Sequence, residues 1–303
     1  MIDLDALLEE TSRTFALSIP LLPEPLRRQI GLGYLVFRVA DTFEDEGDWP
    51  VAQRIAALRL IGPALLQPDG AEAAEFARHC AAAEVDHAGY RRLLQSWPQL
   101  AAEFGALDPA ARGVICAHLQ RSAAGMCEFL LDRPSSMDEL RRYCYAVAGI
   151  VGELCTELFV LHSPQLGPVR AELMARAAPF GEGLQLVNIL RDAQVDALHA
   201  RHFVPRSVSR DQLIERAGSN LDKAIEYIDL LQRRGAGGAV AFNALNLGLA
   251  VQTLSLVDRD GAGARLDGGR VFALLESIAE MTARGASVLP LLRQLSEASH
   301  ERV

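Results

Sequence analysis

Two short acidic clusters constrain this chain more than any other feature, because each places like charges on an otherwise apolar helix. The sequence reads DTFED over residues 41–45 and RDAQVD over residues 191–196. In each cluster the outer aspartates stand four positions apart, so both project from one helix face. The two pairs are Asp41 with Asp45 and Asp192 with Asp196. If the pairs faced each other, each contact at about 4 Å would cost roughly 4 kcal/mol at an effective dielectric of 20. Mg²⁺ would relieve this repulsion and take phosphate oxygens as further ligands, so the clusters predict a phosphate ester as substrate.

Each cluster also brings its own guanidinium. Arg38 lies three positions before Asp41, and Arg191 lies next to Asp192. This pairing suits a diphosphate that a metal binds on one side and arginine on the other. The alternative is a solvated helix face with intrahelical ion pairs. Both clusters follow apolar stretches, GLGYLVFRVA and GLQLVNIL, where an exposed face would hold more charge, and this favours the functional interpretation.

Composition predicts an all-α protein, and the absence of repeats and long linkers predicts one domain over residues 1–303. Hydrophobic residues make up 50% of the chain and aromatic residues only 6%, and alanine and leucine are abundant, which favours helix over sheet. The formal net charge of −9 disfavours nucleic acid as a partner, because binding to a phosphate backbone requires a basic surface.

Helical periodicity and the Pro and Gly residues that interrupt it divide the chain into segments without a long linker. Helices are predicted near residues 3–11, 24–45, 51–66, 84–96, 109–132, 136–161, 169–196, 218–234, 238–257 and 268–298, the last broken near Pro290.

The cysteines and the apolar segments bear on location. The five cysteines form no CxxC pair and are expected to be small buried residues in a reducing compartment, so we expect a cytoplasmic protein. The acidic N-terminus lacks the apolar region of a secretory signal. The stretch 239–257 is long enough to span a bilayer, but Asn243, Asn246 and Gln252 interrupt it, so we expect a buried core helix and no transmembrane helix. Peripheral contact with a membrane stays open.

Three further motifs carry two interpretations each. Gln185, Asn188 and Asp192 form a polar stripe on an apolar helix, either as a structural network or as an extension of a metal site. TSRTF at residues 11–15 is either a turn or a phosphate-binding loop. The small residues of YCYAVAGIVGE at 143–153 allow either tight helix packing or the close approach of a long ligand. Tyr143, which opens this last motif, is a candidate proton mediator.

Other chemistries find little support in the sequence. The histidines include no HExxH and have no cysteine companions, which argues against zinc. There is no GxGxxG after a strand and no Walker A motif, so neither a Rossmann domain nor a P-loop is indicated.

The ordered set SRTF, YLVFRVADTFED, GMCEFL, YCYAVAGIVGE, LQLVNILRD and RHFVP, which extends to Pro205, resembles the squalene and phytoene synthases. These enzymes join two prenyl diphosphates head to head. The resemblance implies an all-α isoprenoid-synthase bundle with a central cavity, and the two acidic motifs on opposite walls of that cavity.

The resemblance also implies roles for individual residues. As Mg²⁺ ligands it implies Asp41, Glu44, Asp45, Asn188, Asp192 and Asp196. As substrate contacts it implies Ser12, Arg13, Phe15, Tyr34, Arg38, Ala148, Gly149, Gly152, Gln185, Arg191 and Arg201. The catalytic residues would be the four outer aspartates, with Tyr143 assisting proton removal.

The implied reaction couples two farnesyl diphosphates through presqualene diphosphate to a C30 product, which is squalene if NADPH supplies a hydride and dehydrosqualene if it does not. Phytoene synthase, which uses geranylgeranyl diphosphate, is the enzyme alternative, and a non-catalytic assembly protein of the same fold is the alternative from another class. Two departures matter: Val195 replaces a glutamate of the second motif, and Ala200 stands where a glycine commonly precedes Arg201. A missing carboxylate could leave an enzyme that stops at the intermediate.

Overall fold

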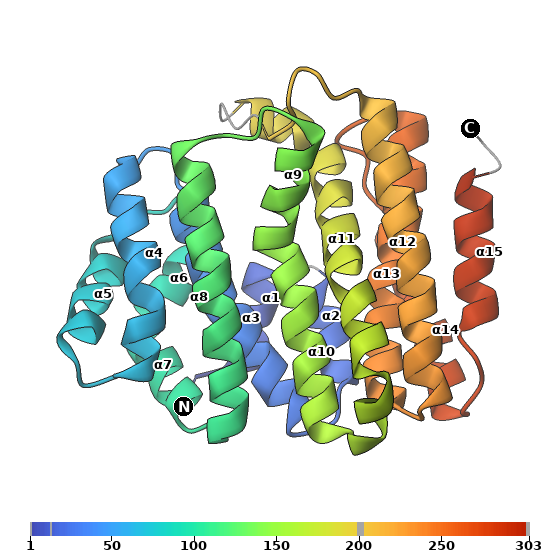
Figure 1. The fold of residues 1–303 in the computed structure, drawn as a ribbon, viewed down its shortest axis with the longest axis horizontal. Coiled ribbons are helices and arrows are strands. Elements are labelled where there is room, and N and C mark those ends of the chain that lie inside the picture. The colour runs from blue at the N-terminus through green and yellow to red at the C-terminus, as the bar shows by residue number, and fades with distance from the viewer. Residues whose placement is uncertain (1, 13, 199–202, 301–303) are drawn as a thin grey trace. The chain divides into compact units, whose positions relative to one another are not determined.

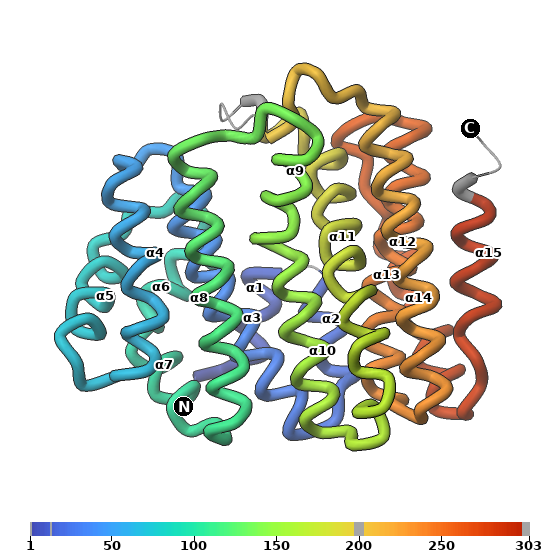
Figure 2. Tube along the Cα trace, in the orientation of Figure 1, coloured from blue at the N-terminus to red at the C-terminus, as the bar shows by residue number. Residues whose placement is uncertain are grey.

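The computed structural model describes residues 2–12, 14–198 and 203–300, and no β-strand occurs among them (Figures 1 and 2). The prediction of an all-α protein is therefore confirmed. The chain forms two compact units, one of Met1–Ala16 with Glu24–Arg133 and the other of Leu17–Pro23 with Pro134–Val303. The single domain over residues 1–303 stays a prediction.

The first unit is built around α3, α4 and α8. Its helices are α1 (Leu4–Thr11), α3 (Leu26–Asp45), α4 (Val51–Leu66), α5 (Ala71–Ala82), α6 (Ala88–Gln95), α7 (Trp97–Gly105) and α8 (Pro109–Leu131), and α2 (Phe15–Ser18) begins in this unit. α4 runs beside α8, and α3 packs against both (Figure 1). Buried aromatic rings join α3, α5 and α7: Phe76 lies 5.5 Å from Phe43 and 4.5 Å from Trp97 between ring centroids. Aromatic pairs in such geometry add to the free energy of burial.

The second unit packs its helices around α13. Its elements are η1 (Ile19–Leu21), α9 (Met137–Cys144), η2 (Tyr145–Gly149), α10 (Ile150–His162), η3 (Pro164–Val169), α11 (Arg170–Leu198), α12 (Arg210–Arg233), α13 (Gly237–Asp260), α14 (Gly268–Ala283) and α15 (Leu289–His300). The η2 segment is one π-helical turn that links α9 to α10, so that Met137–His162 form one continuous helix. α11 and α12 run side by side, and α12, α14 and α15 pack on α13 (Figures 1 and 2).

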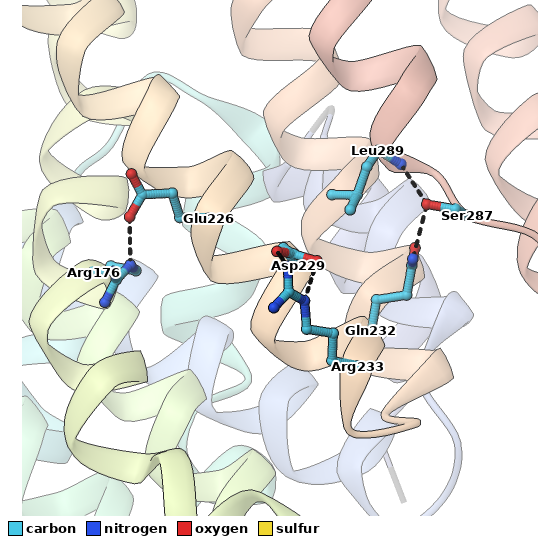
Figure 3. Close-up of polar contacts among 7 residues, drawn as sticks. All are labelled: Arg176, Glu226, Asp229, Gln232, Arg233, Ser287 and Leu289. Atoms are coloured by element: carbon cyan, nitrogen blue, oxygen red, sulfur yellow. Dashed lines mark hydrogen bonds and ion pairs between the residues drawn. The ribbon is translucent and has the colours of Figure 1, made fainter.

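Polar contacts fasten α12 at its C-terminal half (Figure 3). Arg176 of α11 donates to Glu226 at 2.8 Å. Gln232 donates to Ser287 at 2.8 Å and accepts from the backbone of Val288 at 3.0 Å, so it holds the connection between α14 and α15. The last helical stretch is interrupted at residues 284–288, where Gly285 takes a positive φ of 66° and the backbone N–H of Ala286 donates to the carbonyl oxygen of Met281 at 2.8 Å.

The observed helix boundaries differ from the predicted ones at α12 and in the last helical stretch. Helix α12 starts at Arg210 rather than at 218, because Ser209 and Gln212 form a capping box that satisfies its first backbone N–H groups. The break in the last stretch falls before Pro290, which lies in the first turn of α15, where its missing N–H removes no helical bond. Helices α5 and α7 were not predicted. Both bury short apolar stripes that only tertiary packing stabilises.

The cysteines and apolar helices agree with the expected burial. Cys80, Cys116, Cys127 and Cys144 are free and buried, and Cys155 is free and half-buried. Helix α13 is a core helix, with 89% of its apolar window buried. By length and composition alone, two stretches could cross a membrane: Gly237–Asp260, which is α13, and Met137–His162, whose window is 44% buried.

Candidate active site

Beyond its first turn, helix α3 carries one half-buried stripe and is otherwise buried. From Gln29 to Asp45 every side chain is buried except those of Tyr34, Arg38, Asp41 and Asp45. Their spacings of four, three and four place all of them on one helix face. This stripe carries the residues that the sequence analysis predicts to bind metal and diphosphate. The buried apolar side chains of α3 hold it in place.

Arg38 is fixed by several neighbours within the first unit. Its Nη1 lies 3.3 Å from Asp41 Oδ2. Its Nε and Nη2 both donate to Tyr34 Oη at 3.2 Å, and Tyr34 Oη donates to the backbone oxygen of Thr11 at 2.9 Å. The guanidinium carbon also lies 5.5 Å from the ring centroid of Tyr34 and 5.6 Å from that of Tyr90. Arg38 therefore keeps its orientation without a bound ligand.

The two carboxylates of α3 fit a hard cation. Burial raises the pKa of Asp41 to about 6, Arg38 acts against this shift, and the charge of Asp45 adds to it. A divalent cation between the carboxylates would relieve both the burial cost and the mutual repulsion, and oxygen donors are the ligands that Mg²⁺ prefers. Glu44, predicted as a supporting ligand, is 8% exposed, and its negative charge acts on Arg54 of α4. It lies off the half-buried stripe.

The N-terminal segment meets α3 through the carbonyl oxygen of Thr11 and the ring of Phe15. Ser12 Oγ accepts a hydrogen bond from the backbone N–H of Phe15 at 2.9 Å, so it caps the turn that opens α2. The ring of Phe15 lies 5.3 Å from that of Tyr34. The ring of Phe15 thus lies beside the stripe, Ser12 adjoins Thr11, whose carbonyl oxygen binds Tyr34, and Arg13 lies outside the described residues. The substrate contacts of Ser12 and Phe15 stay predictions.

In the second unit, the polar stripe of α11 is open rather than packed. Asn188 is exposed, and Gln185, Asp192 and Asp196 are half-buried, between the buried residues Leu186, Val187, Ile189 and Leu190. Because Asn188 is exposed, its amide is not part of a buried hydrogen-bond network. This argues against the structural interpretation of the stripe, which was one of the two that the sequence left open. The exposed amide is consistent with a ligand role.

Asp192 is neutralised by two arginines. Arg191 Nε donates to Asp192 Oδ1 at 3.0 Å, and Arg265 Nη2 lies 3.4 Å from the same oxygen. The backbone N–H of Gly263 donates to the carbonyl oxygen of Arg191 at 2.7 Å, which fastens the α13–α14 connection to α11. Arg265 was not predicted, because nothing in its local sequence indicates that its loop returns to α11.

Of the two remaining predicted site residues, the structure describes Tyr143 but not Arg201. The side chain of Tyr143 is 3% exposed, and its ring stacks on that of Phe203 at 5.2 Å with an interplanar angle of 18°. Its part in proton removal stays a prediction. Arg201 and Ala200 lie outside the described residues.

The small residues of the 143–153 motif pack against α11. A Cβ on Gly152 would lie 2.2 Å from the carbonyl oxygen of Ala177, and a Cβ on Gly181 would lie 2.2 Å from that of Ala148. For Gly149 the carbonyl oxygen of Ala178 would be 3.4 Å away. Close helix packing accounts for these residues, and their lining of a hydrocarbon tunnel stays a prediction.

Each unit supplies a carboxylate pair rather than a complete metal cage. Among the described residues, no group of three or more His, Cys, Asp or Glu side chains is arranged to hold a metal ion. Mg²⁺ commonly binds through one or two carboxylates together with water and substrate phosphates, so a pair of this kind is sufficient. That both pairs act on one substrate stays a prediction.

The family follows from a comparison with known proteins. The family model for squalene/phytoene synthase matches residues 8–212, which include both acidic clusters. The chain belongs to the squalene/phytoene synthase family. The resemblance inferred from the motifs is confirmed.

Relatives within the squalene/phytoene synthase family include human squalene synthase, 31% identical over 229 residues that make up 74% of this chain and 52% of the human protein. A probable squalene synthase of Neurospora crassa is 28% identical over 280 residues, which are 84% of this chain and 56% of that protein. The chain thus spans about half the length of the squalene synthases that it matches.

Solved structures share the squalene/phytoene synthase fold. A complex of TcSQS with a ligand has a TM-score of 0.74 at 21% identity and covers 98% of this chain and 96% of its own. A dehydrosqualene synthase with a ligand has a TM-score of 0.59 at 18% identity, covering 93% of this chain and 95% of its own. At these identities the likeness shows the fold alone.

One departure from the squalene/phytoene synthase pattern is on the surface. Val195, where the resemblance expects a glutamate, is 44% exposed on α11. No packing requirement explains the apolar residue there. Relative to the family pattern, the valine removes one negative charge near Asp192 and Asp196.

Proposed function

We propose that this protein condenses two farnesyl diphosphates head to head, through presqualene diphosphate, to a C30 product. The observation that carries the proposal is the α3 stripe, on which a fixed arginine and two carboxylates lie half-buried beside Tyr34, while the other side chains from Gln29 to Asp45 are buried. Arginine and carboxylate side by side suit a metal-bound diphosphate.

In this proposal the outer aspartates of both motifs would hold Mg²⁺, which supplies positive charge to the departing diphosphate. Arg38 and Arg191 would bind diphosphate oxygens, because a guanidinium presents several donors in a fixed plane. The buried apolar side chains around α3 would keep water away, which would otherwise capture a carbocation as an alcohol.

The proposed chemistry has two steps. In the first, the C–O bond of one substrate breaks, diphosphate leaves, and the resulting allylic cation is attacked by the 2,3 double bond of the second substrate; loss of a proton gives the cyclopropyl intermediate. In the second, the remaining diphosphate leaves and the cation rearranges. It then gains a hydride from NADPH, which gives squalene, or loses a proton, which gives dehydrosqualene. Tyr143 is the residue we assign to proton removal.

A product assay tests the proposal and its enzyme alternative. Squalene synthase relatives at 31% identity support C15 substrates, and the family also includes phytoene synthases, which would use C20 substrates. The purified protein is given Mg²⁺ with farnesyl or geranylgeranyl diphosphate, with and without NADPH, and products are identified by mass. A C30 product supports the proposal, and a C40 product supports phytoene synthase. Failure to consume either diphosphate rejects both.

The non-catalytic alternative is separated by a double variant. Asp41→Ala with Asp45→Ala should abolish turnover while the far-UV circular dichroism stays helical. The matched control, Asp48→Ala, alters an exposed aspartate after the end of α3 and should retain turnover. An assembly protein would show no turnover in any of these proteins.

A further inference from the structure

Tyr90 of α6 belongs to none of the motifs that define the α3 stripe, yet its ring faces the stripe's arginine. The guanidinium carbon of Arg38 lies 5.6 Å from the ring centroid of Tyr90 and 5.5 Å from that of Tyr34. At about 6 Å or less an aromatic ring attracts a cation, and the attraction grows when both groups are withdrawn from water. Arg38 and Tyr90 are both half-buried.

Close packing against α1 fixes the position of α6. Gly89, the neighbour of Tyr90, packs so closely on the end of α1 that a Cβ there would lie 2.4 Å from the carbonyl oxygen of Glu10. The next carbonyl of α1, that of Thr11, accepts the hydrogen bond from Tyr34 Oη. One turn of α1 therefore sets the positions of both tyrosines.

The helix end that carries Tyr90 is also held in place. His87 Nδ1 accepts a hydrogen bond from the backbone N–H of Tyr90 at 3.3 Å, and the two rings stack at 4.1 Å between centroids. Tyr90 thus presents a fixed ring to Arg38.

Arg38 needs such support because Asp41 competes for it. Its Nη1 lies 3.3 Å from Asp41 Oδ2, while Nε and Nη2 are bound by Tyr34 Oη. An aromatic face attracts the guanidinium without consuming its N–H donors, so it can hold Arg38 in place while those donors turn to another anion.

We propose that Tyr90 is a positioning residue that holds Arg38 for diphosphate binding through the face of its ring. This inference rests on the proposed function. It assigns to α6 a part in substrate binding, and it predicts that the ring matters and the hydroxyl does not.

Binding of inorganic pyrophosphate with Mg²⁺, measured by isothermal titration calorimetry on the full chain, tests this assignment. Tyr90→Leu should bind pyrophosphate about fivefold more weakly than the wild type, as expected for one half-buried cation–π contact. Tyr90→Phe keeps the ring and should stay within about twofold of the wild type. Equal affinity of the wild type and Tyr90→Leu would overturn the proposal, as would equal losses in the Leu and Phe variants.

Repeating the measurement in an Arg38→Met variant separates a positioning role of Tyr90 from a general packing role. If Tyr90 acts through Arg38, then Tyr90→Leu should cause no further loss of pyrophosphate affinity in a protein that already carries Arg38→Met. A similar loss in both backgrounds would show that Tyr90 acts by another route and would overturn the proposal.

Leu94→Ala is the packing control, because Leu94 is 1% exposed on the same helix and is not part of the stripe. It should lower the melting temperature and leave pyrophosphate affinity unchanged. If Tyr90→Leu does not fold, Tyr90→Met takes its place, because methionine fills irregular space.

Wild-type results separate this proposal from the proposed function. A wild type that binds pyrophosphate and turns over prenyl diphosphate, but is matched by Tyr90→Leu, would overturn only the role of Tyr90. A wild type that binds no pyrophosphate with Mg²⁺ would overturn both.

Discussion

Arg38 and Asp41 form an ion pair across one turn of α3, with Nη1 3.3 Å from Oδ2, and the pKa of Asp41 is nevertheless raised to about 6. Burial therefore outweighs the attraction of the arginine, and the charge of Asp45 adds to the shift. In the metal-free protein the two carboxylates therefore repel each other, and a bound cation would remove this repulsion.

Asp41→Asn should stabilise the metal-free protein at neutral pH. The folded carboxyl binds its proton more tightly than the unfolded one, so its ionisation costs stability as the pH rises from about 4 to about 6 and above. We expect a gain of about 1–3 kcal/mol at pH 8 in urea unfolding with chelator present, and almost no difference near pH 4. Asp48→Asn, on the exposed connection after α3, should leave the curves unchanged. A less stable Asp41→Asn at pH 8 would contradict the assigned environment.

Gly152→Ala should destabilise the second unit. The added Cβ would lie 2.2 Å from the carbonyl oxygen of Ala177, a backbone atom that cannot move without separating α10 from α11. We expect a loss of at least about 2 kcal/mol in the free energy of unfolding.

Gly113→Ala provides the matched control for this prediction. Gly113 lies within α8 with nothing within 4 Å of its Cβ position, so alanine there should stabilise the protein by up to about 1 kcal/mol. If both variants shifted stability alike, the close approach at Gly152 would not be the cause.

The cysteines should resist thiol reagents in the folded protein. Burial raises the pKa of Cys116 to about 11 and that of Cys155 to about 12, and it also raises the pKa of Cys80 and Cys144. Only the thiolate reacts, so iodoacetamide at pH 7.5 should modify none of them within minutes. All five should react in denaturant, as mass spectrometry will show. Rapid labelling of the native protein would mean that the helices around these side chains open readily.

Val195→Glu tests whether the missing carboxylate of the second motif limits the reaction. The side chain is 44% exposed, so the substitution should change the free energy of unfolding by less than about 0.5 kcal/mol. If the carboxylate assists the second step, the ratio of C30 hydrocarbon to presqualene diphosphate should rise in the variant. Val195→Gln, of similar size and without charge, should leave the ratio unchanged. An equal rise in both variants would exclude charge as the reason.

Much of the fold could be read from local patterns. The i, i+4 spacing of Asp41 and Asp45 within an apolar stretch identified the half-buried face of α3. Ser136 stands before an acidic first turn and caps α9 by accepting from the Glu139 backbone N–H at 3.2 Å, which is also a local pattern. These features depend on neighbours within one or two helical turns.

Other features could not be read in this way. Helix α5 has a short apolar stripe of Ala73, Phe76 and Cys80, which is too small to predict a helix until Phe43 and Trp97 are known to pack against Phe76. The capping box of α12, formed by Ser209 and Gln212, is by contrast a local pattern that the sequence does carry.

The sequence alone determined that the chain is helical, which faces of α3 and α11 carry charge, and which family the motifs indicate. Tertiary structure decided which distant residues complete those faces: Tyr90 beside Arg38, and Arg265 beside Asp192, a contact between residues 73 positions apart. The reason is physical. Periodicity fixes the direction of a side chain relative to its own helix, whereas the partner that it meets depends on how helices pack, and close approaches such as those at Gly89 and Gly152 set that packing.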